Sequence, residues 1–188
     1  MRDTVMWISL PLTVALALTA AVADSRSPSG KTELVYPVVP GHGGVVPLPR
    51  AAEQPRKGAK AVFDITADAK PDAVNMGLEY VAGLLNLYGA AGLKAGDVKI
   101  AAVLHGEATK AVLSDTAYAA RFKAAANPNL PLIRDLKKAG VEVFVCGQAL
   151  HGLRFKTEDV AEEVTVAAAG VLVLTNKQMD GYAYFSAR

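Results

Sequence analysis

From residue 59 onward, short apolar runs alternate with stretches whose apolar residues recur at helical spacing. The runs at 60–65, 98–104, 141–145, 164–166 and 182–185 have the length of strands, and the first is typical of a buried one. After the first run, side chains three or four positions apart mark one helical face: Val74, Leu78, Val81, Leu85 and Tyr88. Strands alternating with helices predict a single α/β domain over 59–188 with a mostly parallel sheet of about five strands.

Proline, glycine and capping residues mark where the helices of this domain begin and end. Pro71-Asp72 opens the first helix, because proline is tolerated in a first turn, and Gly89 or Gly92 ends it. Thr157-Glu158-Asp159 resembles a helix cap with acidic residues in the first turn. Further helices are predicted over 108–124, 130–138, 148–151 and 168–179.

The first 23 residues have the pattern of a secretory signal peptide. No residue from Val5 to Ala23 is charged, Arg2 precedes this run, and Ala21-Val22-Ala23 supplies the small residues that signal peptidase requires. We therefore predict cleavage after Ala23, export to a bacterial periplasm and no stable membrane insertion after cleavage. The alternative is an uncleaved membrane anchor, because this uncharged run is nearly long enough to span a bilayer.

Residues 24–58 form a proline- and glycine-rich arm ahead of the domain. Proline removes a backbone donor and disfavours helix at the residue before it, so no long helix is expected here. The apolar stretches Leu34-Val35-Tyr36 and Val45-Val46-Pro47-Leu48 can each lie against a surface. We expect an ordered arm that wraps the domain or a neighbouring subunit; a flexible linker is the alternative.

Composition excludes several classes of protein. The chain has 188 residues, of which 52% are hydrophobic, so most of it can bury a core. A net charge of +2 without a dense basic stripe argues against nucleic-acid binding. With Cys146 as the one cysteine, no intramolecular disulfide or multi-cysteine metal site can form. No Walker motif is present, and the three histidines lack the spacing of a metal site.

Two strand ends carry residues capable of chemistry. In open parallel sheets, ligands bind beyond the carboxyl ends of the strands. His105 follows the second strand, and Cys146, Gly147 and Gln148 follow the third. Backbone amides around Gly147 and Gln148 favour the thiolate of Cys146, which is the nucleophilic form. His105 and His151 are candidates for acid/base or orienting roles beside it.

Each of these residues also has a plain structural interpretation. A lone cysteine is usually a small buried hydrophobe, and burial against Phe144 or Leu150 would make its thiol unreactive. His151 is more often a surface residue, His105 can simply end a strand, and His42 in the arm has no evident chemical role. No metal or organic cofactor is expected.

The segment from Val141 to Leu150, which reads VEVFVCGQAL, resembles the cysteine motif of the DsrE/DsrF-like sulfur proteins. Leu104-His105-Gly106, the closing residues 181–184 and the arm at 37–46 are also similar to members of that family, the arm to exported ones. The resemblance covers roughly 59–188. It implies a three-layer α/β/α fold and homo-oligomers, often trimers or hexamers. It also implies that Cys146 corresponds to the cysteine that carries sulfur as a persulfide.

These observations together predict an exported sulfur-handling protein. Cys146 would accept sulfane sulfur from a donor and pass it to an acceptor thiol, on a protein or a small molecule. Whether this is enzymatic sulfurtransferase activity or carriage alone is left open. One alternative is a non-catalytic oligomeric binding or scaffold protein with a cleft between subunits. Another is a redox sensor in which Cys146 forms a disulfide with a second subunit or a small thiol.

Overall fold

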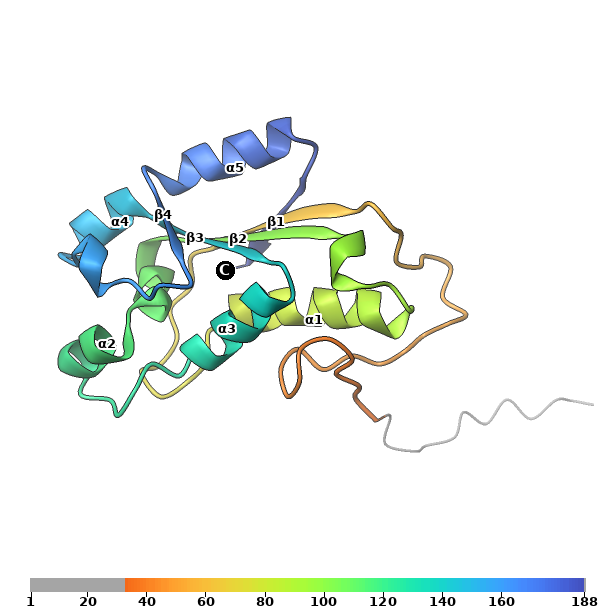
Figure 1. Ribbon diagram of the computed structural model, residues 1–188, viewed down its shortest axis with the longest axis horizontal. Helices are drawn as coiled ribbons and strands as arrows, with labels where there is room; N and C mark the ends of the chain where they lie inside the picture. The colour runs from red at the N-terminus through yellow and green to blue at the C-terminus, as the bar shows by residue number, and fades with distance from the viewer. Residues whose placement is uncertain (1–32, 188) are drawn as a thin grey trace, which may run out of the picture. The chain divides into compact units, whose positions relative to one another are not determined.

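Five parallel strands form one sheet in the computed structural model, which describes residues 33–187 (Figure 1). The strand order is β4-β3-β2-β1-β5, and all four pairings are parallel. The strands are β1 (Lys60–Ile65), β2 (Lys99–Leu104), β3 (Glu142–Cys146), β4 (Thr165–Ala167) and β5 (Ala183–Ala187). The predicted α/β fold with a parallel five-stranded sheet is confirmed. The predicted signal peptide at 1–23 lies outside the described residues.

Helices cover both faces of this sheet, so the domain has three layers (Figure 1). The helices are α1 (Met76–Ala90), α2 (Asp115–Phe122), α3 (Leu130–Lys138), α4 (Gly147–Gly152) and α5 (Gly170–Met179). Side chains of α1 and α3 bury the larger core with Phe63 and Ile65 of β1. On the other face, Leu174 of α5 packs with Val62 and Val103 in a smaller cluster. Alternation along each strand therefore sends neighbouring residues to different layers.

Three expectations from the sequence are wrong. The first helix does not open at Pro71-Asp72, which lie in a turn; it begins at Met76, because Asn75 caps it by accepting a hydrogen bond from Gly77 N at 2.8 Å. The helix predicted over 108–124 is broken: a 3₁₀ segment over Gly106–Val112 ends before α2, because Ser114 caps a new helix through Ala117 N. Leu113, at the break, forms an antiparallel bridge with Val160. Thr157 opens a single 3₁₀ turn, Thr157–Asp159, which leads into extended chain at Val160 and not into an α-helix. The adjacent Val160 is held extended by the same bridge.

Residues 37–45 of the arm are fastened to α1 by one buried side chain. Asn86 is 0% exposed, and its Oδ1 accepts hydrogen bonds from Val38 N and Val39 N, both at 2.9 Å. Its Nδ2 donates to His42 O at 2.8 Å and to Gly43 O at 3.0 Å. A single amide thus satisfies both donors and acceptors of the loop between Val35 and Val45, which pair with each other in an antiparallel bridge.

Glycine at position 43 lets this loop approach α1 closely. Gly43 has a φ of +57°, and a Cβ there would lie 2.1 Å from Gly83 N. Its amide donates to Glu79 Oε2 at 2.7 Å, and His42 Nδ1 lies 2.7 Å from Glu79 Oε1. The described part of the arm is therefore packed on its own domain.

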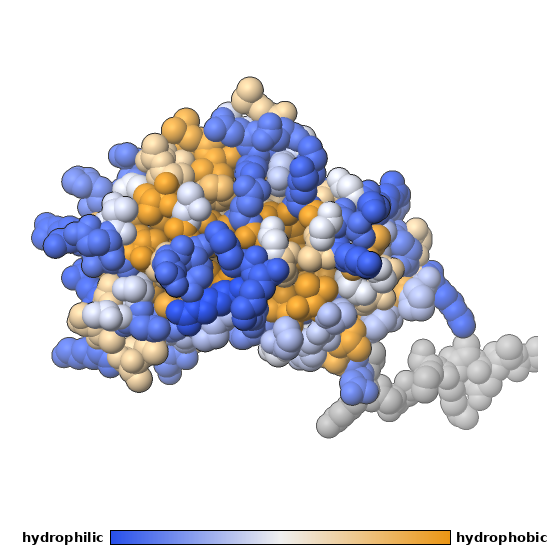
Figure 2. Space-filling view, viewed as in Figure 1, coloured by the Kyte–Doolittle hydropathy of each residue, from blue (hydrophilic) through white to orange (hydrophobic). Residues whose placement is uncertain are grey.

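Hydrophobic side chains also reach the surface, and Figure 2 shows apolar areas among hydrophilic ones on one face of the molecule. The exposed large hydrophobic residues come from the arm, α1, α5 and β5: Leu34, Tyr36, Leu48, Met76, Tyr80, Leu87, Val171, Leu172, Met179, Tyr184 and Phe185. Among residues 33–187, no helix has both the length and the hydropathy needed to cross a membrane.

Replacing Asn86 by leucine should destabilise the protein by about 3 kcal/mol, because it leaves the buried amides of Val38 and Val39 unpaired. Urea unfolding followed by circular dichroism measures the change. Asn176→Ala, on the exposed side of α5, is the control and should change stability by no more than about 0.5 kcal/mol. A loss below about 1 kcal/mol for Asn86→Leu would contradict the anchoring role.

Candidate functional site

Four side chains form a polar row across the sheet on the face that α5 covers. Asp64 lies in β1 opposite Val103 of β2, and His105 follows β2 two positions later. Leu104 pairs with Val145, so His105 and Cys146 come next in register on adjacent strands. Tyr184 of β5 completes the row at its other end. The parallel register thus brings together residues that are up to 120 positions apart in the sequence.

Asp64 links the histidine and the tyrosine. His105 Nε2 lies 2.5 Å from Asp64 Oδ1, and the Tyr184 hydroxyl donates to Asp64 Oδ2 at 2.5 Å. Because an ionised carboxylate only accepts, the Nε2 of His105 carries the proton. Asp64 is 8% exposed and is the one charged residue among the buried residues of the described chain. Charge-assisted hydrogen bonds on both oxygens offset the free-energy cost of burying it.

Cys146 lies beside His105 under the first turn of α5. Its residue is 8% exposed, and it is a free thiol. A Cβ placed on Gly170 would lie 3.3 Å from Cys146 Cβ and 3.6 Å from His105 Cδ2. The start of α5 is therefore packed closely over both residues, and a side chain at position 170 would press on Cys146. Backbone amides at a helix start carry partial positive charge, and those of α5 begin next to Cys146.

An ion pair holds α5 against the sheet. Lys177 Nζ lies 2.5 Å from Glu142 Oε1 on β3. Burial acts to lower the pKa of Lys177, but the hydrogen bond and the attraction to Glu142 outweigh it, so the pKa lies above its ordinary value. Lys177 also lies over the rings of Phe144 and Tyr182. The helix that covers Cys146 is thus fixed by charge as well as by apolar contacts.

Gly147, Gln148 and His151, which were also predicted for the site, differ in how closely they are associated with Cys146. Gly147 starts α4 directly after Cys146, and a Cβ there would lie 2.9 Å from Ala167 O. Gln148 is exposed, and its Nε2 donates to Ala168 O at 3.2 Å, in the segment that leads into α5. His151 is exposed near the end of α4, and no described side chain bonds its ring. The structure thus groups Cys146 with His105, and not with His151.

Sequence reasoning missed Asp64 and Tyr184. A signal for Asp64 was present, because it is the one acidic residue in the otherwise apolar stretch from Ala61 to Ile65. Tyr184 had no such signal, since an aromatic residue in an edge strand is ordinary. In the described part of the chain, no group of three or more His, Cys, Asp or Glu side chains is placed to hold a metal ion.

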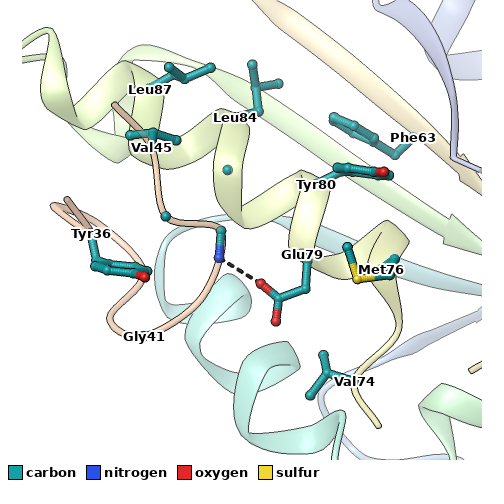
Figure 3. Close-up of a pocket in the computed structure, with 13 residues that line it drawn as sticks. Tyr36, Gly41, Val45, Phe63, Val74, Met76, Glu79, Tyr80, Leu84 and Leu87 are labelled. Atoms are coloured by element: carbon teal, nitrogen blue, oxygen red, sulfur yellow. Dashed lines mark hydrogen bonds between the residues drawn. The ribbon is translucent and has the colours of Figure 1, made fainter. Parts of the chain in front are cut away.

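A separate cavity of about 660 Å³ lies on the opposite face of the sheet, between the arm and α1 (Figure 3). Its walls include Tyr36 and Val45 of the arm, Tyr80 and Leu87 of α1, and Phe63 of β1. The one charged residue among its lining residues, Glu79, is hydrogen-bonded to His42 and Gly43. The cavity is suited to apolar contacts, whereas the groups able to do covalent chemistry lie around Cys146.

Comparison with known proteins agrees with this architecture. The sequence matches the model of the DsrE/DsrF-like family over residues 60–187. The chain therefore belongs to the DsrE/DsrF-like family. A solved structure of a protein of unknown function from Methanobacterium thermoautotrophicum is similar in fold, with a TM-score of 0.53 and 22% identity. The similarity covers 69% of this chain and 99% of that one. None of the curated proteins matches the sequence.

Adding a methyl group at Gly170 should slow chemistry at the thiol. The new Cβ of Gly170→Ala would press on Cys146, so we expect alkylation of the folded protein by iodoacetamide to slow by about tenfold, with a stability loss of about 1–2 kcal/mol. Gly152→Ala in α4 is the matched control, because a Cβ there meets open space. An unchanged alkylation rate in Gly170→Ala would contradict the close packing of α5 on Cys146.

Proposed function

We propose that this member of the DsrE/DsrF-like family is an exported sulfur carrier that holds sulfane sulfur on Cys146 as a persulfide and passes it to an acceptor thiol. Family membership associates the chain with sulfur relay in general terms. The observation that carries the finer proposal is the position of Gly170 at the start of α5, where an added Cβ would lie within 3.6 Å of atoms of both Cys146 and His105. A potential nucleophile, a potential base and a helix start meet there.

The proposed loading step is an exchange between a thiol and a persulfide. The thiol proton of Cys146 passes to His105, and the thiolate attacks the outer sulfur of a donor RS–SH. The new bond joins Cys146 Sγ to that sulfur, the S–S bond of the donor breaks, and RS⁻ leaves with the electron pair. His105 then protonates RS⁻. The products are the Cys146 persulfide and RSH, with no net oxidation. Unloading is attack of an acceptor thiolate on the outer sulfur.

Access to the thiol is restricted in this arrangement. Cys146 is 8% exposed, whereas the side chain of His105, on the adjacent strand, is 32% exposed. A donor would therefore approach across the histidine ring at the carboxyl end of the sheet. Such an approach favours small sulfur donors and keeps His105 within reach of the leaving group.

Inorganic polysulfide is the probe for this proposal. The purified chain, treated with it and desalted, should gain one sulfur atom in its intact mass, and Cys146→Ser should gain none. A thiol added afterwards should remove the sulfur. The same spectrum reports whether residues 1–23 have been removed, as export predicts. A wild-type chain that takes no sulfur, yet is alkylated at Cys146 once unfolded, would overturn the carrier proposal.

The cavity beside α1 supports a second candidate function, oligomeric binding or scaffolding without turnover. Met76, Tyr80 and Leu87 of α1 are exposed, and Tyr80 and Leu87 line the cavity together with Tyr36 of the arm. Large exposed apolar areas mark interaction surfaces. We propose a homo-oligomer, a trimer or hexamer, in which this surface is buried between subunits. Carrier and scaffold roles differ in whether Cys146 takes up sulfur.

Assembly is tested by light scattering on the purified chain at micromolar concentration. The wild type should have a mass above that of a monomer, and Tyr80→Arg should shift the population toward monomer, because it places a charge in the proposed apolar interface. Met179→Arg, an equally apolar but more exposed position on α5, should leave the mass unchanged. A monomeric wild type would remove this proposal.

A further inference from the structure

Burying the charged side chain of Asp64 at its position in β1 costs free energy. Its neighbours in β1, Phe63 and Ile65, are buried apolar side chains, and Val62 fills the same layer as Asp64 under α5. Replacing a buried charge and its partners by apolar groups is often neutral or stabilising. A chain selected only for folding has no need of an acidic residue here. Local features that oppose folding concentrate at functional sites.

We infer that Asp64 and Tyr184 are positioning residues for His105, and that this row holds the imidazole ready to take the thiol proton of Cys146. The inference rests on the proposed function only for the sulfur transfer, since the proton movement itself can be measured without sulfur. Tyr184 orients the carboxylate of Asp64 through a hydrogen bond, and Asp64 in turn orients the imidazole of His105. Neither is placed in contact with the reacting sulfur.

The hydrogen bonds fix which nitrogen of His105 is available. Asp64 Oδ1 accepts from Nε2, so the neutral ring has its lone pair on Nδ1. Among the described residues, no side chain bonds Nδ1, and the His105 side chain is 32% exposed, so water can reach the ring. We take Nδ1, through a bridging water, as the acceptor of the thiol proton. When Nδ1 takes a proton, the ring becomes cationic and the Asp64 carboxylate lies against it. Attraction between the two charges holds the ring in place while it carries the proton.

Tyr184 keeps the carboxylate in place. Its hydroxyl donates to Asp64 Oδ2 from the next strand, so the two carboxylate oxygens are held by groups on opposite sides of β1. Rotation of the carboxyl group away from His105 would break a charge-assisted hydrogen bond. Tyr184 is thus the far end of a chain of hydrogen bonds that runs across β5, β1 and β2.

The first measurement is alkylation of Cys146 by iodoacetamide on the folded chain at pH 7. Asp64→Leu should slow it by at least about tenfold, because the imidazolium that accompanies the thiolate loses its counter-charge. Asp64→Asn should fall between Asp64→Leu and the wild type, since an amide oxygen can still accept from Nε2 without supplying a charge. Tyr184→Phe should have a smaller effect than Asp64→Leu. Tyr182→Phe, on the same face and 3.5 Å from Glu142, is the matched control and should be unchanged.

A spectroscopic signature separates positioning from a merely structural role. In the wild type, the Nε2 proton of His105 should give a protected imidazole signal in the proton NMR spectrum, because it is bonded to a buried carboxylate. Asp64→Leu should abolish that signal while urea unfolding shows that the variant still folds, because the His105 and Tyr184 side chains are exposed enough for water to replace the lost acceptor. With polysulfide as donor, the rate of persulfide formation should fall by about 10²-fold or more in the same variant.

The outcomes distinguish this inference from the proposed function. Wild-type alkylation and persulfide rates in a folded Asp64→Leu variant would overturn the positioning role. If the wild type takes no sulfur but Asp64→Leu still slows alkylation, the carrier proposal fails and the positioning role stands. Marked destabilisation in Asp64→Leu, with alkylation unchanged in Asp64→Asn, would make Asp64 a structural residue and overturn the inference.

Discussion

The hydrogen-bond register between β1, β2 and β3 is the constraint on which the site depends. Asp64 pairs with Val103, and Leu104 pairs with Val145, so the side chains of Asp64, His105 and Cys146 project to one face in a diagonal row. Because side chains alternate along a strand, a slip of one residue in any pairing would send one of them into the opposite layer. Buried apolar residues next to these three side chains fix the same strand register. The backbone hydrogen bonds that align the core residues therefore also align the site residues.

The two faces of the sheet serve different purposes. The face packed against α1 and α3 buries the larger apolar cluster and accounts for most of the stabilising burial. The face under α5 has a small apolar cluster and a buried carboxylate. A domain can carry such an unfavourable group because the other face supplies the stability. The single helix over Cys146 also makes α5 the element whose movement would open the thiol to solvent.

Local patterns were enough to predict the strands, the parallel sheet and the location of Cys146 and His105 at strand ends. They failed where a single polar residue competes with periodicity, as at Ser114, which starts a new helix inside an apparently continuous one. Local patterns also failed where two interacting residues are far apart in the sequence. Asp64 meets His105 across 41 positions, and α5 reaches Cys146 through Gly170, neither of which leaves a local trace. A lone acidic residue in a buried strand was the one available sign.

Asn86 has a consequence for where this protein can be cut. The family match starts at residue 60, whereas the amide of Asn86 binds backbone at 38–43, which precedes it. The evolutionary unit and the folding unit therefore have different boundaries. A fragment that begins at the family boundary would expose on α1 an amide that the intact chain keeps buried against its own loop. Such a fragment would have only water to replace the backbone partners of Asn86, so the arm belongs to the smallest piece that keeps this contact.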